Sequence, residues 1–136
     1  MSEPGTPAQA AKRRILVADD DPIVLRFLGA LLMDAGYEVE TAEDGEKALQ
    51  KIREGKPELI ILDLVMPYRD GFDVCRAARQ NPATKDVPVI ILSMKDKESD
   101  VLRCFEIGAD EFVRKPFNAL ELLARIGKML ARRPRT

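Results

Sequence analysis

The chain has 136 residues, none of which is a histidine, and only two are cysteines. The absence of histidine excludes serine–histidine and cysteine–histidine nucleophile systems and most zinc sites. Cys75 and Cys104 each lie among apolar neighbours in segments with helical spacing, so we expect buried free thiols rather than a disulfide or a metal site. Any metal site is therefore expected to hold a hard cation through oxygen ligands.

A charge excess of one sign and a long apolar run are also missing. The 22 lysines and arginines nearly balance the 23 acidic residues, and a net charge of −1 gives no electrostatic basis for nucleic-acid binding. No apolar run is long enough to cross a bilayer, and the first residues lack the apolar core of a secretory signal. These features predict a cytoplasmic protein with neither a membrane nor a nucleic-acid partner.

Apolar strand-like and amphipathic helix-like segments alternate along the chain, about five times. The pattern predicts strands over 15–18, 37–42, 59–62, 87–92 and 110–113, and helices over 23–35, 43–55, 72–80, 98–107 and 118–130. Such alternation is typical of an α/β fold with a doubly wound five-stranded parallel sheet flanked by helices. We expect a disordered leader over 1–12, one folded domain over 13–131, and a basic tail over 132–136.

The segment Glu58–Pro67 is the centre of this pattern. Its apolar run from Leu59 to Leu62 shows no alternation, which is typical of a strand buried on both faces. The run ends at Asp63, and ligands of open α/β sheets bind at the carboxyl ends of the strands. Asp63 is therefore either a helix cap or a reactive group.

Polar residues also follow the other predicted strands. Parallel strands bring their carboxyl ends to one edge, so we expect these residues to converge: Asp19, Asp20, Asp63, Ser93 and Lys115. Carboxylates about 4 Å apart repel by roughly 4 kcal/mol per pair at an effective dielectric constant of about 20. The cluster must therefore take up protons or bind a cation, and Mg²⁺ suits a few carboxylates with water and phosphate. A carboxylate nucleophile, a metal and a lysine together meet the needs of phosphoryl transfer.

Each of these residues, taken alone, also has a simpler interpretation. Asp21 before Pro22 is most simply a helix N-cap, and Asp19 and Asp20 alone could form a solvated acidic turn. Likewise, Ser93 alone is more often a turn residue, Lys115 a surface charge and Phe112 a core residue. The functional interpretation depends on the shared position of the cluster members at strand ends.

Four segments of the chain, in the same order, resemble the receiver domain of bacterial two-component response regulators: Ile15–Pro22, Leu62–Pro67, Ile91–Ser93 and Gly108–Phe117. The resemblance implies a flavodoxin-like receiver fold. It also implies that Asp63 accepts a phosphoryl group from a histidine kinase or a histidine phosphotransfer protein. Asp19, Asp20, Asp63 and the backbone carbonyl of Val65 would then hold Mg²⁺.

The resemblance further implies that Ser93 and Lys115 bind the acyl phosphate. Phe112 would change rotamer when Ser93 is drawn toward the phosphoryl group, and the Lys115–Pro116 peptide bond would be cis. Two residues depart from the family pattern. Met94 stands where a small residue is usual, which narrows access to Asp63, and Phe112 replaces the commoner tyrosine.

Charged positions near the end of the chain resemble those through which winged-helix response regulators pair their receivers: Glu106, Asp110, Glu111, Glu121 and Arg125. Val101 stands where that subgroup usually has an arginine. The alternative is a solvated charged face. We therefore expect at most a weak, phosphorylation-dependent homodimer.

Two rival functions remain open from the sequence. A phosphatase resembling the haloacid dehalogenase superfamily would use Asp19 as nucleophile and Asp21 as acid/base, but Asp63 would then have no role. A degenerate receiver that acts only as a binding module would not need the full set of cluster residues. The sequence identifies neither the cognate kinase nor the downstream effector.

Overall fold

The computed structural model describes residues 12–133, and these residues form strands and helices in strict alternation. The strands are β1 (Arg14–Ala18), β2 (Glu38–Ala42), β3 (Leu59–Leu62), β4 (Val89–Ser93) and β5 (Glu111–Arg114). The helices are α1 (Pro22–Asp34), α2 (Gly45–Gly55), α3 (Gly71–Gln80), α4 (Glu98–Ile107) and α5 (Ala119–Ala131). All strand pairs are parallel and the order is β2-β1-β3-β4-β5, so the predicted doubly wound sheet is confirmed.

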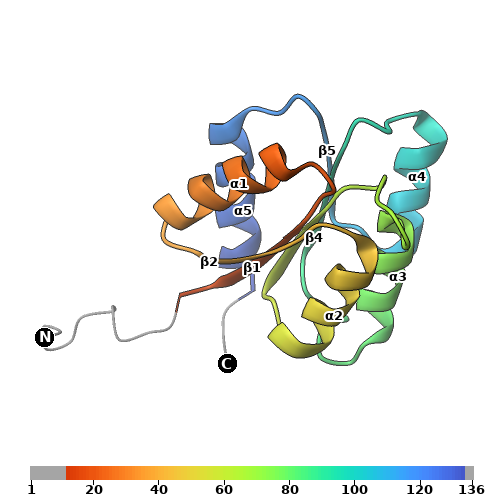
Figure 1. Cartoon of the computed structure of the whole chain (residues 1–136), viewed down its shortest axis with the longest axis horizontal. Coiled ribbons are helices and arrows are strands. Elements are labelled where there is room, and N and C mark those ends of the chain that lie inside the picture. Colours follow the sequence, from red (N-terminus) through yellow and green to blue (C-terminus); the bar gives the residue numbers. More distant parts are fainter. Residues whose placement is uncertain (1–11, 134–136) are drawn as a thin grey trace, which may run out of the picture.

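The helices cover both faces of the sheet. Helices α1 and α5 lie on one face, and α2, α3 and α4 lie on the other (Figure 1). Alternate residues of β1, β3 and β4 contribute to two separate apolar clusters, one on each face. Every residue of β3 and β4 is buried, which explains why these strands are continuously apolar in sequence.

Four helices begin at a side chain that accepts a backbone N–H of the first turn. The capping residues are Asp21 for α1, Asp44 for α2, Asp70 for α3 and Asn118 for α5. Asp21 was predicted to have this role. Helix α4 differs, because its N-cap is Lys97 and no side chain caps it.

The structure moves several predicted boundaries by one or two residues. Strand β4 begins at Val89 rather than Val87, because Pro88 has no N–H to donate and the N–H of Val87 bonds to Thr84 O in a turn. Helix α2 ends at Gly55 as predicted but begins at Gly45 rather than at Glu43, because Asp44 has an extended backbone and is the N-cap. Strand β5 begins one residue later than predicted, since the side chain of Asp110 accepts the backbone N–H of Val89.

The leader predicted over residues 1–12 lies almost entirely outside the described residues, as do the last three residues of the predicted basic tail. The described part of that tail is held in place, because Arg133 donates a hydrogen bond to the carbonyl of Asp86 at 2.7 Å. Cys75 and Cys104 are buried free thiols, as expected. Over residues 12–133 the structure contains no helix with the length and apolar character that a membrane crossing requires.

Candidate functional site

The polar residues at the strand ends converge as predicted. Asp19 follows β1, Asp63 follows β3, Ser93 is the last residue of β4, and Lys115 follows β5. One carboxylate oxygen from each of Asp19, Asp20 and Asp63 lies within 4.8 Å of the others. Asp19 and Asp63 are 2% and 7% exposed, whereas Asp20 is exposed, so the acidic cluster has two buried members and is open to solvent at Asp20.

Asp63 lies at the centre of a hydrogen-bond network. Ser93 Oγ donates to Asp63 Oδ1 at 2.7 Å, and the backbone N–H of Val65 donates to the same oxygen at 3.2 Å. Lys115 Nζ donates to Asp63 Oδ2 at 3.0 Å and to Asp19 Oδ2 at 2.7 Å. The Ser93 hydroxyl and the Lys115 ammonium group therefore bind different oxygens of the Asp63 carboxylate.

The charges in this cluster do not balance, because three carboxylates face one ammonium group. Burial raises the pKa of Asp19, the hydrogen bonds from Lys115 and Asp21 lower it, and the charge of Asp63 raises it again, with a net upward shift. Burial alone lowers the pKa of Lys115, but hydrogen bonds and charges from Asp19 and Asp63 outweigh it, so the net shift is upward. Lys115 is thus charged at neutral pH, and the excess negative charge suits a hard divalent cation.

Phe112, the expected switch residue, lies on β5 opposite Ile91 of β4. Its ring is partly buried and packs against the apolar cluster on the face covered by α2, α3 and α4. The Arg114 guanidinium lies 5.8 Å from the centre of this ring. The peptide bond between Lys115 and Pro116 is cis, as the family resemblance implied.

Gly71 supports the cluster in a way that the sequence did not reveal. A Cβ atom added at Gly71 would lie 2.3 Å from the carbonyl oxygen of Asp63 and 2.8 Å from the Cα of Leu64. The start of α3 therefore packs directly on the backbone that carries Asp63. An Asp-Gly pair is typical of a turn, and close packing of a helix start on a strand end leaves no local signal in the sequence.

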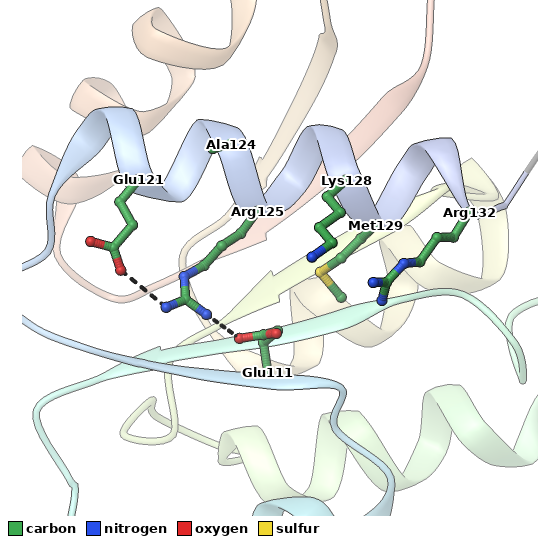
Figure 2. A pocket seen from close by; sticks show the side chains of 7 residues that line it. All are labelled: Glu111, Glu121, Ala124, Arg125, Lys128, Met129 and Arg132. Atoms are coloured by element: carbon green, nitrogen blue, oxygen red, sulfur yellow. Dashed lines mark hydrogen bonds and ion pairs between the residues drawn. The ribbon is translucent and has the colours of Figure 1, made fainter.

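Four of the five residues of the expected dimer face, Asp110, Glu111, Glu121 and Arg125, form ion pairs within the chain. Arg125 forms ion pairs with both Glu111 and Glu121 (Figure 2). Asp110 is bound by Arg79, whose guanidinium donates to Asp110 Oδ2 at 2.9 Å and to the Gly108 carbonyl at 2.7 Å. This arginine joins the end of α3 to the α4–β5 turn, a contact that the sequence did not predict.

A groove of about 340 Å³ also lies on this face, between α5 and β5. Figure 2 shows Glu121, Arg125, Lys128 and Arg132 following one another along α5 at its edge. None of its lining residues belongs to the acidic cluster at the strand ends. The groove and the cluster are therefore separate features.

The chain is similar to two-component regulators along most of its length. Residues 15–127 match the model of the response regulator receiver domain. The chain is 41% identical over 121 residues to the DNA-binding response regulator MtrA of Mycolicibacterium smegmatis, covering 89% of this chain and 52% of that protein. It is 41% identical over 120 residues to the alkaline phosphatase synthesis transcriptional regulatory protein PhoP of Bacillus subtilis, covering 88% and 49%.

Solved structures agree with these relatives. A response regulator from Chloroflexus aurantiacus superposes with a TM-score of 0.83 at 38% identity, covering 89% of this chain and 99% of that one. The chemotaxis protein CheY4 of Vibrio cholerae gives 0.83 at 33% identity, covering 88% and 99%. The chain spans about half the length of the curated relatives it matches. It belongs to the response regulator receiver domains, which are signalling phosphoacceptors rather than catalytic enzymes.

Proposed function

We propose that Asp63 is the phosphoacceptor and that a histidine kinase or a histidine phosphotransfer protein is the donor. The observation that supports this most directly is the environment of the Asp63 carboxylate. Ser93 Oγ binds one of its oxygens and Lys115 Nζ binds the other, beside the carboxylates of Asp19 and Asp20. Two donors are thus already in place beside the carboxylate that would carry the phosphoryl group.

In the proposed reaction a carboxylate oxygen of Asp63 attacks the phosphorus of a phosphohistidine. A bond forms between that oxygen and phosphorus, the bond from phosphorus to the imidazole nitrogen breaks, and the imidazole leaves with the electron pair. Lys115 then neutralises one phosphoryl oxygen and Ser93 donates a hydrogen bond to another. Lys115 bridges Asp19 and Asp63 in this structure, so it can turn toward the product while remaining in contact with the cluster.

We propose Mg²⁺ as the resident metal. Asp19, Asp20 and Asp63, with the backbone carbonyl of Val65, would hold the ion. Three carboxylate oxygens within 4.8 Å and an uncompensated negative charge fit a hard cation that prefers oxygen ligands. When bound, Mg²⁺ would neutralise charge on the transferred phosphoryl group.

The phosphorylated state would favour a second conformation of the partner-binding face. Hydrogen bonds to charged groups contribute roughly 1.5–3 kcal/mol each. Ser93 and Lys115 already bond to Asp63 in this conformation, so only the difference in these bonds between the two states shifts the equilibrium. A shift from 1:99 to 99:1 needs about 5.5 kcal/mol. Phe112 would respond by changing rotamer beside Ser93, and some active conformation would be populated without phosphate.

The test is intact mass spectrometry after incubation with acetyl phosphate and MgCl₂. The native chain should gain one phosphoryl group, and Asp63→Asn should gain none. Asp21→Asn is a matched control, because asparagine also caps a helix and Asp21 serves α1. A label mapped to Asp19 instead of Asp63 would favour the phosphatase alternative. Full labelling of Asp63→Asn would refute the proposal.

A weak homodimer through Glu106, Asp110, Glu111, Glu121 and Arg125 is a second part of the proposal. Glu111 and Glu121 already pair with Arg125 of the same chain, so a dimer must exchange these ion pairs rather than add new ones. Such an exchange gains little free energy at exposed positions. Sedimentation of the activated protein as a monomer at every concentration would exclude the dimer.

A further inference from the structure

The loop between β4 and α4, Met94–Lys97, is held by charge rather than by apolar packing. All four of its residues are exposed, and Met94 is 75% exposed. Lys95 Nζ lies 3.6 Å from Asp100 Oδ1 in the first turn of α4, and Arg114 Nε of β5 lies 3.2 Å from Asp96 Oδ2. The loop therefore depends on two ion pairs of modest strength.

This loop is directly connected to the acidic cluster. The backbone N–H of Lys95 donates to Ser93 Oγ at 3.1 Å, and the same oxygen donates to Asp63 Oδ1 at 2.7 Å. Any change in the position of Ser93 Oγ thus alters a hydrogen bond that fixes the backbone at Lys95. Lys95 in turn contacts Asp100, so three contacts in series lead from Asp63 through Ser93 and Lys95 to α4.

The first turn of α4 is incompletely satisfied in this conformation. No side chain caps the helix at Lys97, and Asp100 Oδ2 is buried without a hydrogen-bond partner among the described residues. A buried acceptor without a donor carries a cost in free energy. Asp100 is the third residue of α4, the position from which a carboxylate reaches back to the N-cap N–H in a capping box.

We propose that Asp100 is a positioning residue with two partners. In the conformation described here it pairs with Lys95. When Ser93 moves to a phosphoryl group on Asp63, the Lys95 backbone is released, and Asp100 accepts the N–H of Lys97 and caps α4. The inference rests on the proposed phosphorylation of Asp63. It adds a specific exchange that makes the start of α4 more ordered in the phosphorylated state.

The exchange predicts opposite effects for two substitutions. Lys95→Gln breaks the resting pair but leaves Asp100 free to cap, so the affinity for beryllofluoride with MgCl₂ should rise about threefold. Asp100→Ala removes the ion pair with Lys95 from the resting state and the cap at Lys97 from the phosphorylated state. A helix cap contributes more than a partly exposed ion pair, so the affinity should fall about twofold. Lys97→Gln is the matched control, because it removes a positive charge from the same loop while leaving the ion pairs of Lys95 and Asp96 intact.

NMR titration of the full chain gives these affinities and also a direct signature. The Lys97 amide should show slower hydrogen exchange on addition of beryllofluoride in the native chain. The protection should be absent in Asp100→Ala and restored in Asp100→Glu, since glutamate also forms a capping box.

The outcomes separate the two proposals. If the native chain shows no response around Asp63, the proposed phosphorylation site is wrong. If it responds there but the Lys97 amide does not change, the Asp100 exchange is refuted alone. It is equally refuted if Lys95→Gln matches Lys97→Gln, or if Lys95→Gln and Asp100→Ala shift the affinity in the same direction.

Discussion

The loops that follow β3 and β4 both begin at the acidic cluster, yet they are held in very different ways. In the β3–α3 loop Leu64 and Met66 are buried, and Asp70 caps the next helix. The β4–α4 loop buries none of its four residues and leads into a helix without a side-chain cap. The comparison indicates that the β3–α3 loop holds Asp63 in place, whereas the β4–α4 loop is free to change conformation when Asp63 changes charge.

Backbone contacts strengthen this difference. The N–H of Gly71 donates to the carbonyl of Leu64 at 2.9 Å, which closes the β3–α3 loop on itself. The N–H of Gly45 in α2 donates to the carbonyl of Pro67 at 3.3 Å, which ties the loop to a second helix. A loop anchored in this way keeps its geometry when the charge on Asp63 changes.

The largest expected effect is the loss of an apolar anchor from the β3–α3 loop. Leu64 is 1% exposed, so Leu64→Ala should lower the free energy of unfolding by about 2–5 kcal/mol. Met94→Ala in the other loop should change it by no more than about 0.5 kcal/mol, because that side chain is exposed. Urea denaturation measures both. Equal losses for the two variants would remove the distinction between the loops.

Gly71→Ala should break the fixed loop where it touches Asp63. The added Cβ would lie 2.3 Å from the Asp63 carbonyl, so the backbone must shift, at a cost of about 1–3 kcal/mol. Phosphoryl uptake from acetyl phosphate should slow as well. Gly127→Ala in α5 is the matched control, because its Cβ would meet no atom within 4 Å and alanine is the better helix former. Similar stability changes in both variants would show that close packing at Gly71 is unimportant.

Exchanging the caps should bring the two loops closer together. Asp70→Ala removes the cap of α3 and should cost about 1 kcal/mol. Lys97→Asp supplies a capping carboxylate at a residue whose φ of −60° and ψ of 150° already suit an N-cap, and it should add stability of similar size. Thermal unfolding of both variants tests this. A loss of stability in Lys97→Asp would mean that the start of α4 is satisfied by other contacts.

The sequence predicted the rigid parts of the molecule better than the responsive ones. The buried strands, the cap of α1 at Asp21 and the convergence of Asp19, Asp63 and Lys115 all follow from local apolar runs and from the geometry of parallel strands. The contact of Gly71 with the Asp63 backbone could not be predicted, since it depends on how α3 approaches β3. The pairing of Lys95 with Asp100 could not be predicted either, because Lys95 is an exposed lysine with several acidic residues near it in the sequence.

The thiol of Cys104 reports on the body of α4, beyond the β4–α4 loop. Burial, with smaller contributions from the charges of Cys75 and Asp100, raises the pKa of Cys104 from 9.0 to about 11. The folded state therefore favours the protonated thiol. Its contribution to stability is complete below pH 9 and is lost as the pH rises through about 11.

This contribution can be measured as the difference in urea stability between the native chain and Cys104→Ala at pH 8 and at pH 11. The native chain should lose more stability than the variant over this interval. Lys115 is present in both proteins and cancels in the difference. At pH 8 the thiol of Cys104 should also resist alkylation in the folded protein. Rapid alkylation at that pH would show that the whole of α4 moves together with the β4–α4 loop. Slow alkylation would show that only the first turn of α4 moves with the loop.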